Sequence, residues 1–214
     1  MLYSFIHSRR GHWWIAAGAA VILLAGLLLW LLWPAPIPPA SGTLMGWKLY
    51  RSEAGLLKLR PDDGSGAHVV LASRFDQAAA GRERVFYLDG SALYSVNADG
   101  SGTFRVTGGC TPVAVKKTHD IFAPSDSPND LMSLGCYNGY VYVVKNQRLT
   151  RYAEGSRRGE QLSRQQVIAF LITEDGVLRA YDVYNAAPYG TMVDANAGLS
   201  GLEPLYELDL NLLS

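Results

Sequence analysis

The sequence predicts an all-β domain of about four repeated units, preceded by a single transmembrane α-helix. Three observations predict this fold class. The chain has an unbroken apolar run from Trp13 to Trp33, and short strand-like segments separated by turn residues follow residue 43. A leucine in an equivalent setting then recurs along the chain, at Leu57, Leu93, Leu149 and Leu178.

The apolar run has the length and flanks of a membrane span. Its 21 residues cover roughly 31 Å as a helix, close to the ~30 Å hydrocarbon core of a bilayer. Arg9 and Arg10 precede it, whereas no basic residue follows until Lys48. Basic residues stay on the cytoplasmic side, so residues 1–12 are predicted to be a cytoplasmic stub and the body to be exported. Tryptophans at both ends of the run suit the headgroup level.

A cleaved signal peptide is the alternative to an uncleaved anchor. The run is longer than the usual apolar core of ~7–15 residues. The best cleavage site, within residues 38–41, has proline where a small residue is wanted. The sequence therefore favours a single-pass protein of the inner (plasma) membrane with its C-terminal domain in the periplasm or outside the cell. Residues 34–43, rich in proline, are predicted to be a semi-rigid linker that lifts the domain off the membrane.

The exported body, residues 44–214, reads as pairs of strands. Alternation of apolar and polar residues predicts first strands at 47–50, 85–88, 141–144 and 170–173, and second strands at 56–59, 93–96, 149–152 and 178–181. Turn residues separate the strands of a pair, as in Asp89-Gly90, Lys145-Asn146 and Asp175-Gly176. Asn, Asp and Gly supply the positive φ that tight hairpins need.

The first two units are the clearest duplicates. An Asp-Gly-Ser-Gly turn at residues 63–66 leads to a third strand at 69–71, and the same turn at 99–102 leads to one at 104–107. The recurring leucines are 36, 56 and 29 residues apart. The long middle interval holds residues 110–136 and is predicted to be one repeat plus an insertion. Such self-similarity is typical of repeat architectures, because one unit cannot bury its apolar face alone.

Residues 93–107, Leu-Tyr-Ser-Val-Asn-Ala-Asp-Gly-Ser-Gly-Thr-Phe-Arg-Val-Thr, resemble the blade motif of TolB-type β-propeller repeats, which are WD-repeat-like. Residues 56–71 are a weaker copy, and 149–162 and 178–193 are fainter. The resemblance implies a scaffold, and four units imply a small four-bladed propeller, an open or partial one, or a ring completed by another chain. The last strand, residues 205–208, is predicted to pair with the first blade and close the ring.

Cys110 and Cys136 are the two cysteines of the chain. In an oxidising compartment such a pair is most simply a disulfide. It would close a loop of ~25 residues and stabilise the domain by about 3 kcal/mol in the chain-entropy model. Free buried thiols are the alternative. His119 alone does not complete a metal site with them, so no metal is predicted.

A partner-binding surface is predicted at the insertion and at the strands that follow it. The insertion is polar, rich in turn residues and too long for an idle loop, and long loops on rigid scaffolds often carry function. Tyrosines favour interfaces, although they also pack well between blades. The candidate partner-binding residues are Asp126, Asn129, Asp130, Tyr137 and Tyr140.

Catalytic, cofactor and nucleic-acid functions find little support. The first 33 residues carry two of the 19 basic residues and none of the 19 acidic ones, which leaves a net charge of −2 and no basic stripe for nucleic acid. His68 and His119 accompany no nucleophile signature. Turn chemistry explains the aspartates near residues 62 and 99 better than calcium binding. No catalytic residue and no cofactor is predicted.

These observations favour a non-enzymatic binding module: an anchored, exported domain that contacts a protein partner in the cell envelope. An immunity protein that neutralises a periplasm-acting toxin is one concrete version, and an accessory of envelope assembly or secretion is another. A small propeller hydrolase or lyase is the enzymatic alternative. A sensor would have to signal through the stub of residues 1–12.

Overall fold

The computed structural model describes residues 19–28, 35–66, 68–112, 131–182 and 204–213, in two compact units, Met1–Pro36 and Ile37–Ser214. In the first unit, residues 19–28 are helical and all of them are exposed. No helix within the described residues is long and apolar enough to cross a membrane. The other parts of the predicted span, 13–18 and 29–33, lie outside the described residues.

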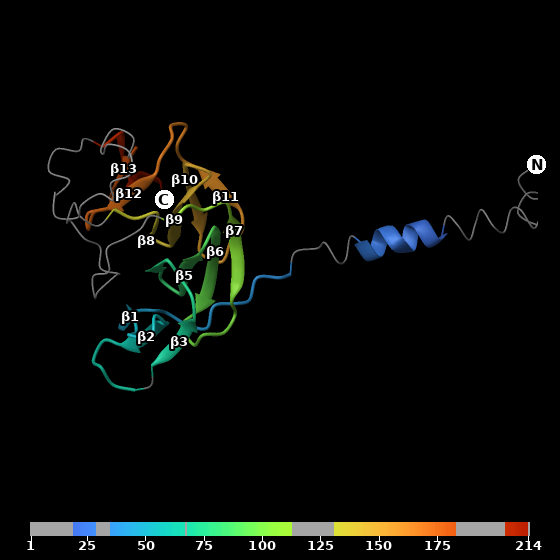
Figure 1. The fold of residues 1–214 in the computed structure, drawn as a ribbon, viewed down its shortest axis with the longest axis horizontal. Coiled ribbons are helices and arrows are strands. Elements are labelled where there is room, and N and C mark those ends of the chain that lie inside the picture. Colours follow the sequence, from blue (N-terminus) through green and yellow to red (C-terminus); the bar gives the residue numbers. More distant parts are fainter. Residues whose placement is uncertain (1–18, 29–34, 67, 113–130, 183–203, 214) are drawn as a thin grey trace, which may run out of the picture. The chain divides into compact units, whose positions relative to one another are not determined.

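The described part of the second unit is built from four antiparallel sheets, numbered here in chain order (Figure 1). Each sheet is a meander of strands that are consecutive in the sequence. Sheet 1 contains β1 (Trp47–Arg51), β2 (Leu57–Pro61) and β3 (Val69–Ala72), and sheet 2 contains β4 (Gln77–Ala80), β5 (Arg84–Asp89), β6 (Ala92–Asn97) and β7 (Phe104–Gly108). Sheet 3 contains β8 (Leu134–Tyr137), β9 (Tyr140–Lys145), β10 (Arg148–Ala153) and β11 (Gly159–Gln161), and sheet 4 contains β12 (Ala169–Ile172), β13 (Val177–Tyr181) and β14 (Tyr206–Asp209). A 3₁₀ helix, η2 (Leu210–Leu213), follows β14.

The recurring leucines confirm the predicted number of units. They lie on β2, β6, β10 and β13, and each is fully buried: Leu57, Leu93, Leu149 and Leu178. Each also faces the last residue of the preceding strand across its hairpin, or the residue next to it, at Arg51, Leu88, Val144 and Ile172. The repeat seen in the sequence is thus one β-meander per unit.

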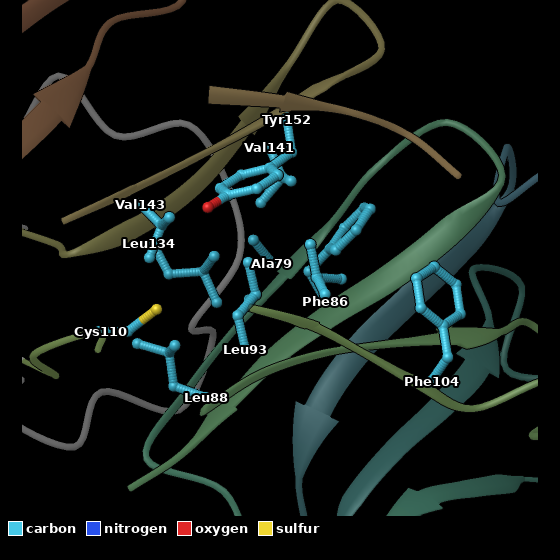
Figure 2. Packing of buried hydrophobic residues seen from close by; sticks show 11 residues of the cluster. Ala79, Phe86, Leu88, Leu93, Phe104, Cys110, Leu134, Val141, Val143 and Tyr152 are labelled. Atoms are coloured by element: carbon cyan, nitrogen blue, oxygen red, sulfur yellow. The ribbon is translucent and has the colours of Figure 1, made fainter. Parts of the chain in front are cut away.

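Three apolar clusters join the four sheets in chain order. The first lies between sheets 1 and 2 and includes Leu59 and Val85. The second lies between sheets 2 and 3, where Phe86 and Leu93 meet Val141 and Tyr152 (Figure 2). The third lies between sheets 3 and 4, and its members include Tyr142, Phe170 and Leu178. Among the described residues no such cluster joins sheet 4 to sheet 1.

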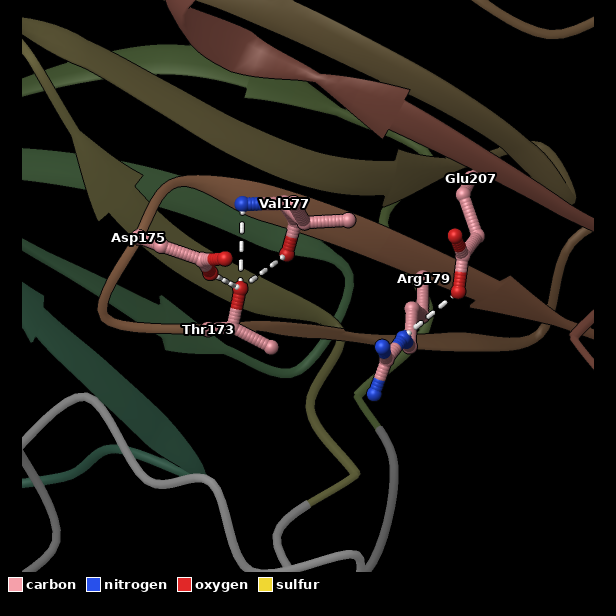
Figure 3. A network of polar contacts seen from close by, with 5 residues as sticks. All are labelled: Thr173, Asp175, Val177, Arg179 and Glu207. Atoms are coloured by element: carbon pink, nitrogen blue, oxygen red, sulfur yellow. Dashed lines mark hydrogen bonds and ion pairs between the residues drawn. The ribbon is translucent and has the colours of Figure 1, made fainter.

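The predicted partner of the last strand is wrong. β14 pairs with β13, from Ala180↔Tyr206 to Val177↔Asp209, and so completes sheet 4 instead of closing onto sheet 1. Two contacts explain this choice. Arg179 Nε donates a 2.7 Å hydrogen bond to Glu207 Oε1 across the pair (Figure 3). Leu210, directly after β14, is 2 % exposed within the third cluster.

Three strands were not predicted from the sequence. β4 is Gln-Ala-Ala-Ala, which lacks the β-branched and aromatic residues typical of strands. β8 contains the last residues of the predicted insertion, and its burial depends on contacts with sheets 2 and 4. β11 is a fully exposed edge strand of three residues, so it carries no apolar alternation.

Candidate functional site

The main candidate site lies where the chain enters the second unit. The structure places residues 37–43 of the predicted linker in that unit. We call residues 37–44 the strap. At its start, Ile37 packs against the cluster between sheets 2 and 3, and at its end Leu44 is buried in the cluster between sheets 1 and 2. The strap therefore crosses one end of sheet 2, from one of its interfaces to the other.

Two turns at this end of sheet 2 hold the strap. The turn before β5 accepts hydrogen bonds at the Arg82 carbonyl, from Leu44 N at 2.8 Å and from Thr43 Oγ1 at 3.3 Å. Beside that turn, the Arg84 guanidinium donates to the Pro38 carbonyl. At the end of β6, Asn97 Nδ2 donates a 3.0 Å hydrogen bond to the carbonyl of the next strap residue, Pro39. Arg84 and Asn97 thus bind consecutive carbonyl groups, and they face each other as a cross-strand pair.

Arg84 is a buried cation that is only partly paired. Its side chain is 2 % exposed, and its guanidinium carbon lies 5.2 Å from the centre of the Phe104 ring. Nη2 binds the strap, whereas Nη1 is buried without a hydrogen-bond partner. Burial lowers the pKa of Arg84, and the nearby carboxylates of Glu154 and Glu83 oppose this effect. A buried charge of this kind is costly unless it is paired.

Asn97 is also buried and also binds the strap through one atom of its side chain while another atom has no partner, but its side-chain amide is neutral. It is 3 % exposed, and its Nδ2 also lies 3.3 Å from Ser101 Oγ, but its Oδ1 is buried without a partner. Gly102 makes the close approach of the strap possible. A Cβ atom at Gly102 would lie 2.6 Å from Asn97 Nδ2 and 3.1 Å from Pro38 Cβ, and the residue has a φ of +61°. Both the space and the backbone conformation at this position favour glycine.

The Asp-Gly-Ser-Gly turns form the turn structure expected from the sequence. Asp99 Oδ1 accepts hydrogen bonds from Ser101 N at 2.9 Å and from Ser101 Oγ at 2.6 Å. Asp63 and Ser65 form the same pair of bonds in sheet 1, at 2.8 and 2.7 Å. These bonds hold the pKa of both carboxyl groups below its usual range, and Ser41 of the strap adds a smaller contribution at Asp99. In the described parts of the chain, no cluster of His, Cys, Asp and Glu forms a metal site.

A polar hollow of about 280 Å³ adjoins the strap, and its lining includes Ala40, Glu83, Arg84 and Glu154. Glu154, in the loop after β10, binds sheet 2 from sheet 3. Its two carboxylate oxygens accept hydrogen bonds from Arg82 N at 2.6 Å and from Glu83 N at 3.0 Å. The hollow therefore combines one buried guanidinium with two carboxylates.

Tyr137 and Tyr140 face each other at the β8–β9 hairpin. Tyr137 Oη donates a 2.9 Å hydrogen bond to Asn211 Oδ1. The centre of the Tyr140 ring lies 4.6 Å from the guanidinium carbon of Arg151. Both tyrosines are half-buried against the cluster between sheets 3 and 4, so they also serve the packing that the sequence left open as an alternative. Their role in binding a partner stays a prediction. Asp126, Asn129 and Asp130 lie outside the described residues.

The predicted disulfide is not formed, and Cys110 and Cys136 are free thiols. Both lie beside β9, where Cys136 faces Val141 and Cys110 faces Lys145. Four residues of strand separate these positions by about 13 Å, whereas bonded cysteines have Cα atoms less than ~7 Å apart. The Cys110 sulfur packs among apolar side chains (Figure 2). Burial raises the pKa of Cys110 to about 11, and it raises that of Cys136 well above its usual value.

His68 directly precedes β3 of sheet 1. Its Nδ1 shares a hydrogen bond with the Tyr50 hydroxyl, and the two rings meet edge to face with their centres 5.6 Å apart. The other candidate histidine, His119, lies outside the described residues.

Sequence reasoning missed the role of Arg84 and Asn97. Their signals were present: a basic residue opens an otherwise apolar strand, and an asparagine closely precedes the second Asp-Gly-Ser-Gly turn. Their carbonyl partners lie 46 and 58 residues away in the sequence, beyond the reach of any local pattern. Comparison with known proteins adds no assignment, because no protein-family model and no curated protein matches the chain.

Proposed function

We propose that this chain is a single-pass membrane protein whose exported, β-propeller-like domain binds a protein partner in the cell envelope and catalyses no reaction. The exposed helix at residues 19–28 supports membrane insertion. Its large apolar side chains are exposed by 51–74 % and include Val21, Ile22 and Leu23. Water disfavours such a surface by roughly 25 cal/mol per Å², and lipid does not. These residues form the centre of the apolar run 13–33.

The arrangement of the sheets supports a propeller-like domain. The first strands of neighbouring sheets approach one another, with β4 beside β8 and β8 beside β12. At the first of these contacts, Gln77 Oε1 accepts hydrogen bonds from Ser133 Oγ at 2.8 Å and from Ser133 N at 3.1 Å. At the second, Met132 forms an isolated β-bridge with Phe170. Innermost strands of propeller blades are expected to adjoin in this way, and we propose an open or partial ring.

A binding role suits the chemistry of the described surface. His68, the histidine within the part of the second unit that the structure describes, is engaged by the Tyr50 hydroxyl. The buried polar groups around the strap are a guanidinium and an amide, which recognise carbonyl groups and are poor nucleophiles and bases at neutral pH. The insertion, residues 110–136, is rich in polar and turn residues, and we propose it as the contact surface. Loops carried by rigid sheets are common contact surfaces.

Affinity capture from detergent-solubilised membranes tests the binding role. The full chain is compared with a triple variant, Asp126→Ala, Asn129→Ala and Asp130→Ala. We expect the variant to keep its melting temperature and to recover less partner, because contact residues in an interface can each cost ~2 kcal/mol or more of binding. The matched control replaces three exposed residues elsewhere, Glu53, Arg74 and Glu174, by alanine and should leave recovery unchanged. Equal recovery by all three proteins would contradict binding through the insertion.

A further inference from the structure

We propose that the end of sheet 2 is a peptide-binding groove. In it, Arg84, Asn97 and Gly102 receive an extended, non-proline segment of the protein partner in place of residues 37–40. This inference rests on the proposed function, since it names the kind of ligand that the domain binds. Four observations support it. Sheets 1 and 3 lack the Arg84–Asn97 pair, and each of these two residues has a buried polar atom without a partner. The prolines of the strap have no N–H group, and part of the strap is exposed.

Sheets 1 and 3 build the same position without buried polar groups. The pair equivalent to Arg84↔Asn97 is Trp47↔Pro61 in sheet 1, and in sheet 3 it is Tyr140↔Ala153. These pairs complete their hairpins with aromatic, cyclic or small side chains. The repeat therefore does not require an arginine and an asparagine at this end, and in sheet 2 they serve the chain that crosses it.

The strap accepts a hydrogen bond from the Asn97 amide and donates none to it. A side-chain amide carries a donor and an acceptor, so it can bind both the carbonyl and the N–H of an extended backbone. Asn97 Nδ2 binds the Pro39 carbonyl, whereas Oδ1 is buried without a partner. Pro38 and Pro39 have no N–H to offer. A segment with ordinary residues at these positions would supply the missing donor.

Arg84 also has a buried group without a partner, and this group is a donor. Nη2 binds the Pro38 carbonyl, and Nη1 is buried without an acceptor. Buried polar groups without partners are rare in native proteins, and here two of them belong to the two side chains that bind the strap. A ligand with an N–H at the position of Pro39 would satisfy Asn97 Oδ1, and this advantage over the strap does not depend on the ligand's side chains.

The strap is also placed to leave the groove. Ile37 and Pro38 are half-buried, and Pro39 and Ala40 are exposed. The hollow of about 280 Å³ lies between residues 37–40 of the strap and Glu83, Arg84 and Glu154, so it borders the place that the ligand would take.

Peptide titration tests the groove. The first probe is the strap sequence of residues 35–42 with alanine at both positions 38 and 39, Ala-Pro-Ile-Ala-Ala-Ala-Ser-Gly, acetylated and fluorescent. The second probe has N-methylalanine at those two positions, which removes only the N–H groups. Both are titrated by fluorescence anisotropy against the full chain in lipid nanodiscs. The tethered strap competes at an effective concentration in the millimolar range, so an Ile37→Ser chain, with a loosened strap, is titrated in parallel.

We expect the alanine peptide to bind saturably, at least about tenfold more tightly than the N-methyl peptide, and more tightly to the Ile37→Ser chain than to the unaltered one. Asn97→Ala should abolish the difference between the two peptides. Arg84→Lys, which keeps the charge but replaces the guanidinium by a single ammonium group, should weaken both. Asp63→Ala, in the equivalent turn of sheet 1, is the control and should change neither. Melting temperatures confirm that each variant is folded.

Absence of saturable binding by the alanine peptide, or equal binding of the two peptides, would overturn the groove. If Asn97→Ala does not fold, the comparison of the two peptides on the Ile37→Ser chain still decides the question. Partner capture separates this result from the proposed function. Capture without peptide binding overturns the groove alone, whereas peptide binding without capture supports the groove and contradicts binding through the insertion.

Discussion

Asn97 Nδ2 lies 3.0 Å from the carbonyl oxygen of Pro39, a residue 58 positions earlier in the chain. This bond joins the proline-rich segment to the turn that follows β6. The segment was predicted to be a spacer, but from Ile37 onward it belongs to the compact unit.

Replacing Gly102 by alanine should disturb the strap. The new Cβ would meet Asn97 Nδ2 and Pro38 Cβ, in addition to the cost of a positive φ, roughly 1–2 kcal/mol for a residue other than glycine. Gly90→Ala is the matched control, because Gly90 has a φ of +56° and a Cβ added there would meet nothing within 4 Å. We expect Gly102→Ala to lower the free energy of unfolding by at least ~1 kcal/mol more than Gly90→Ala. Equal losses in urea unfolding would show that the close approach is unimportant.

Leu210→Ala should weaken sheet 4 strongly. Leu210 is 2 % exposed in the cluster between sheets 3 and 4, and truncation of a buried leucine costs about 2–5 kcal/mol. Leu212, two residues later, is 82 % exposed, so Leu212→Ala should change stability by less than ~0.5 kcal/mol. Thermal unfolding of the two variants checks the position of β14 and η2. Similar melting temperatures would contradict the docking of the C-terminal segment on sheet 4.

The sequence predicted those strands whose own residues alternate, and it missed those that depend on distant contacts. Leu93 and its equivalents could be recognised because each follows a turn and is buried by its own meander. β4 could not, because Gln77 and three alanines become a strand through pairing with β5 and contact with β8. For the last strand, local pattern fixed its type and did not fix its partner.

Thiol counting tests the correction at the cysteines. Denatured, unreduced protein should label two thiols per chain. In the folded protein Cys110 should react slowly at pH 8, because with a pKa of about 11 only about one thiol in a thousand is ionised there. Burial raises the pKa of Cys110 above about 8.5, the pKa of a cysteine in the unfolded chain. As the pH rises from about 8.5, the unfolded state therefore loses its proton first, and the free energy of unfolding should fall. If no thiol is labelled until reductant is added, the two cysteines are bonded and the free-thiol assignment is wrong.

Acid should loosen the strap through Asp99. Hydrogen bonds from Ser101, and a smaller contribution from Ser41 of the strap, hold the pKa of the Asp99 carboxyl below its usual range. Because the folded-state pKa is lowered, this stabilisation is present above the ordinary aspartate pKa of about 3.9 and is lost as the pH falls through the folded-state value. NMR titration should show a lowered pKa for the Asp99 carboxyl, with changes at Ser41 at the same pH. An Asp99 pKa in the ordinary range would contradict this contact.

The candidate site shows the same division between local and long-range information. The preference of tyrosine for interfaces predicts a binding role for Tyr137 and Tyr140, and the structure places both against the cluster between sheets 3 and 4. Arg84 and Asn97 were passed over, although both are buried polar residues that bind a remote segment. Residue type indicated which side chains can form contacts. Only the packing of the strap on sheet 2 showed which of them do so.

The topology of the full chain is the central claim, and reporter fusions test it most directly. One reporter, active only outside the cytoplasm, and another, active only inside it, are each joined after Ser214. If residues 13–33 span the membrane with Arg9 and Arg10 inside, the first reporter should be active, the second silent, and the protein should remain in the membrane fraction at its full length. An active cytoplasmic reporter, or a soluble protein whose first residue lies near Ser41, would contradict the account.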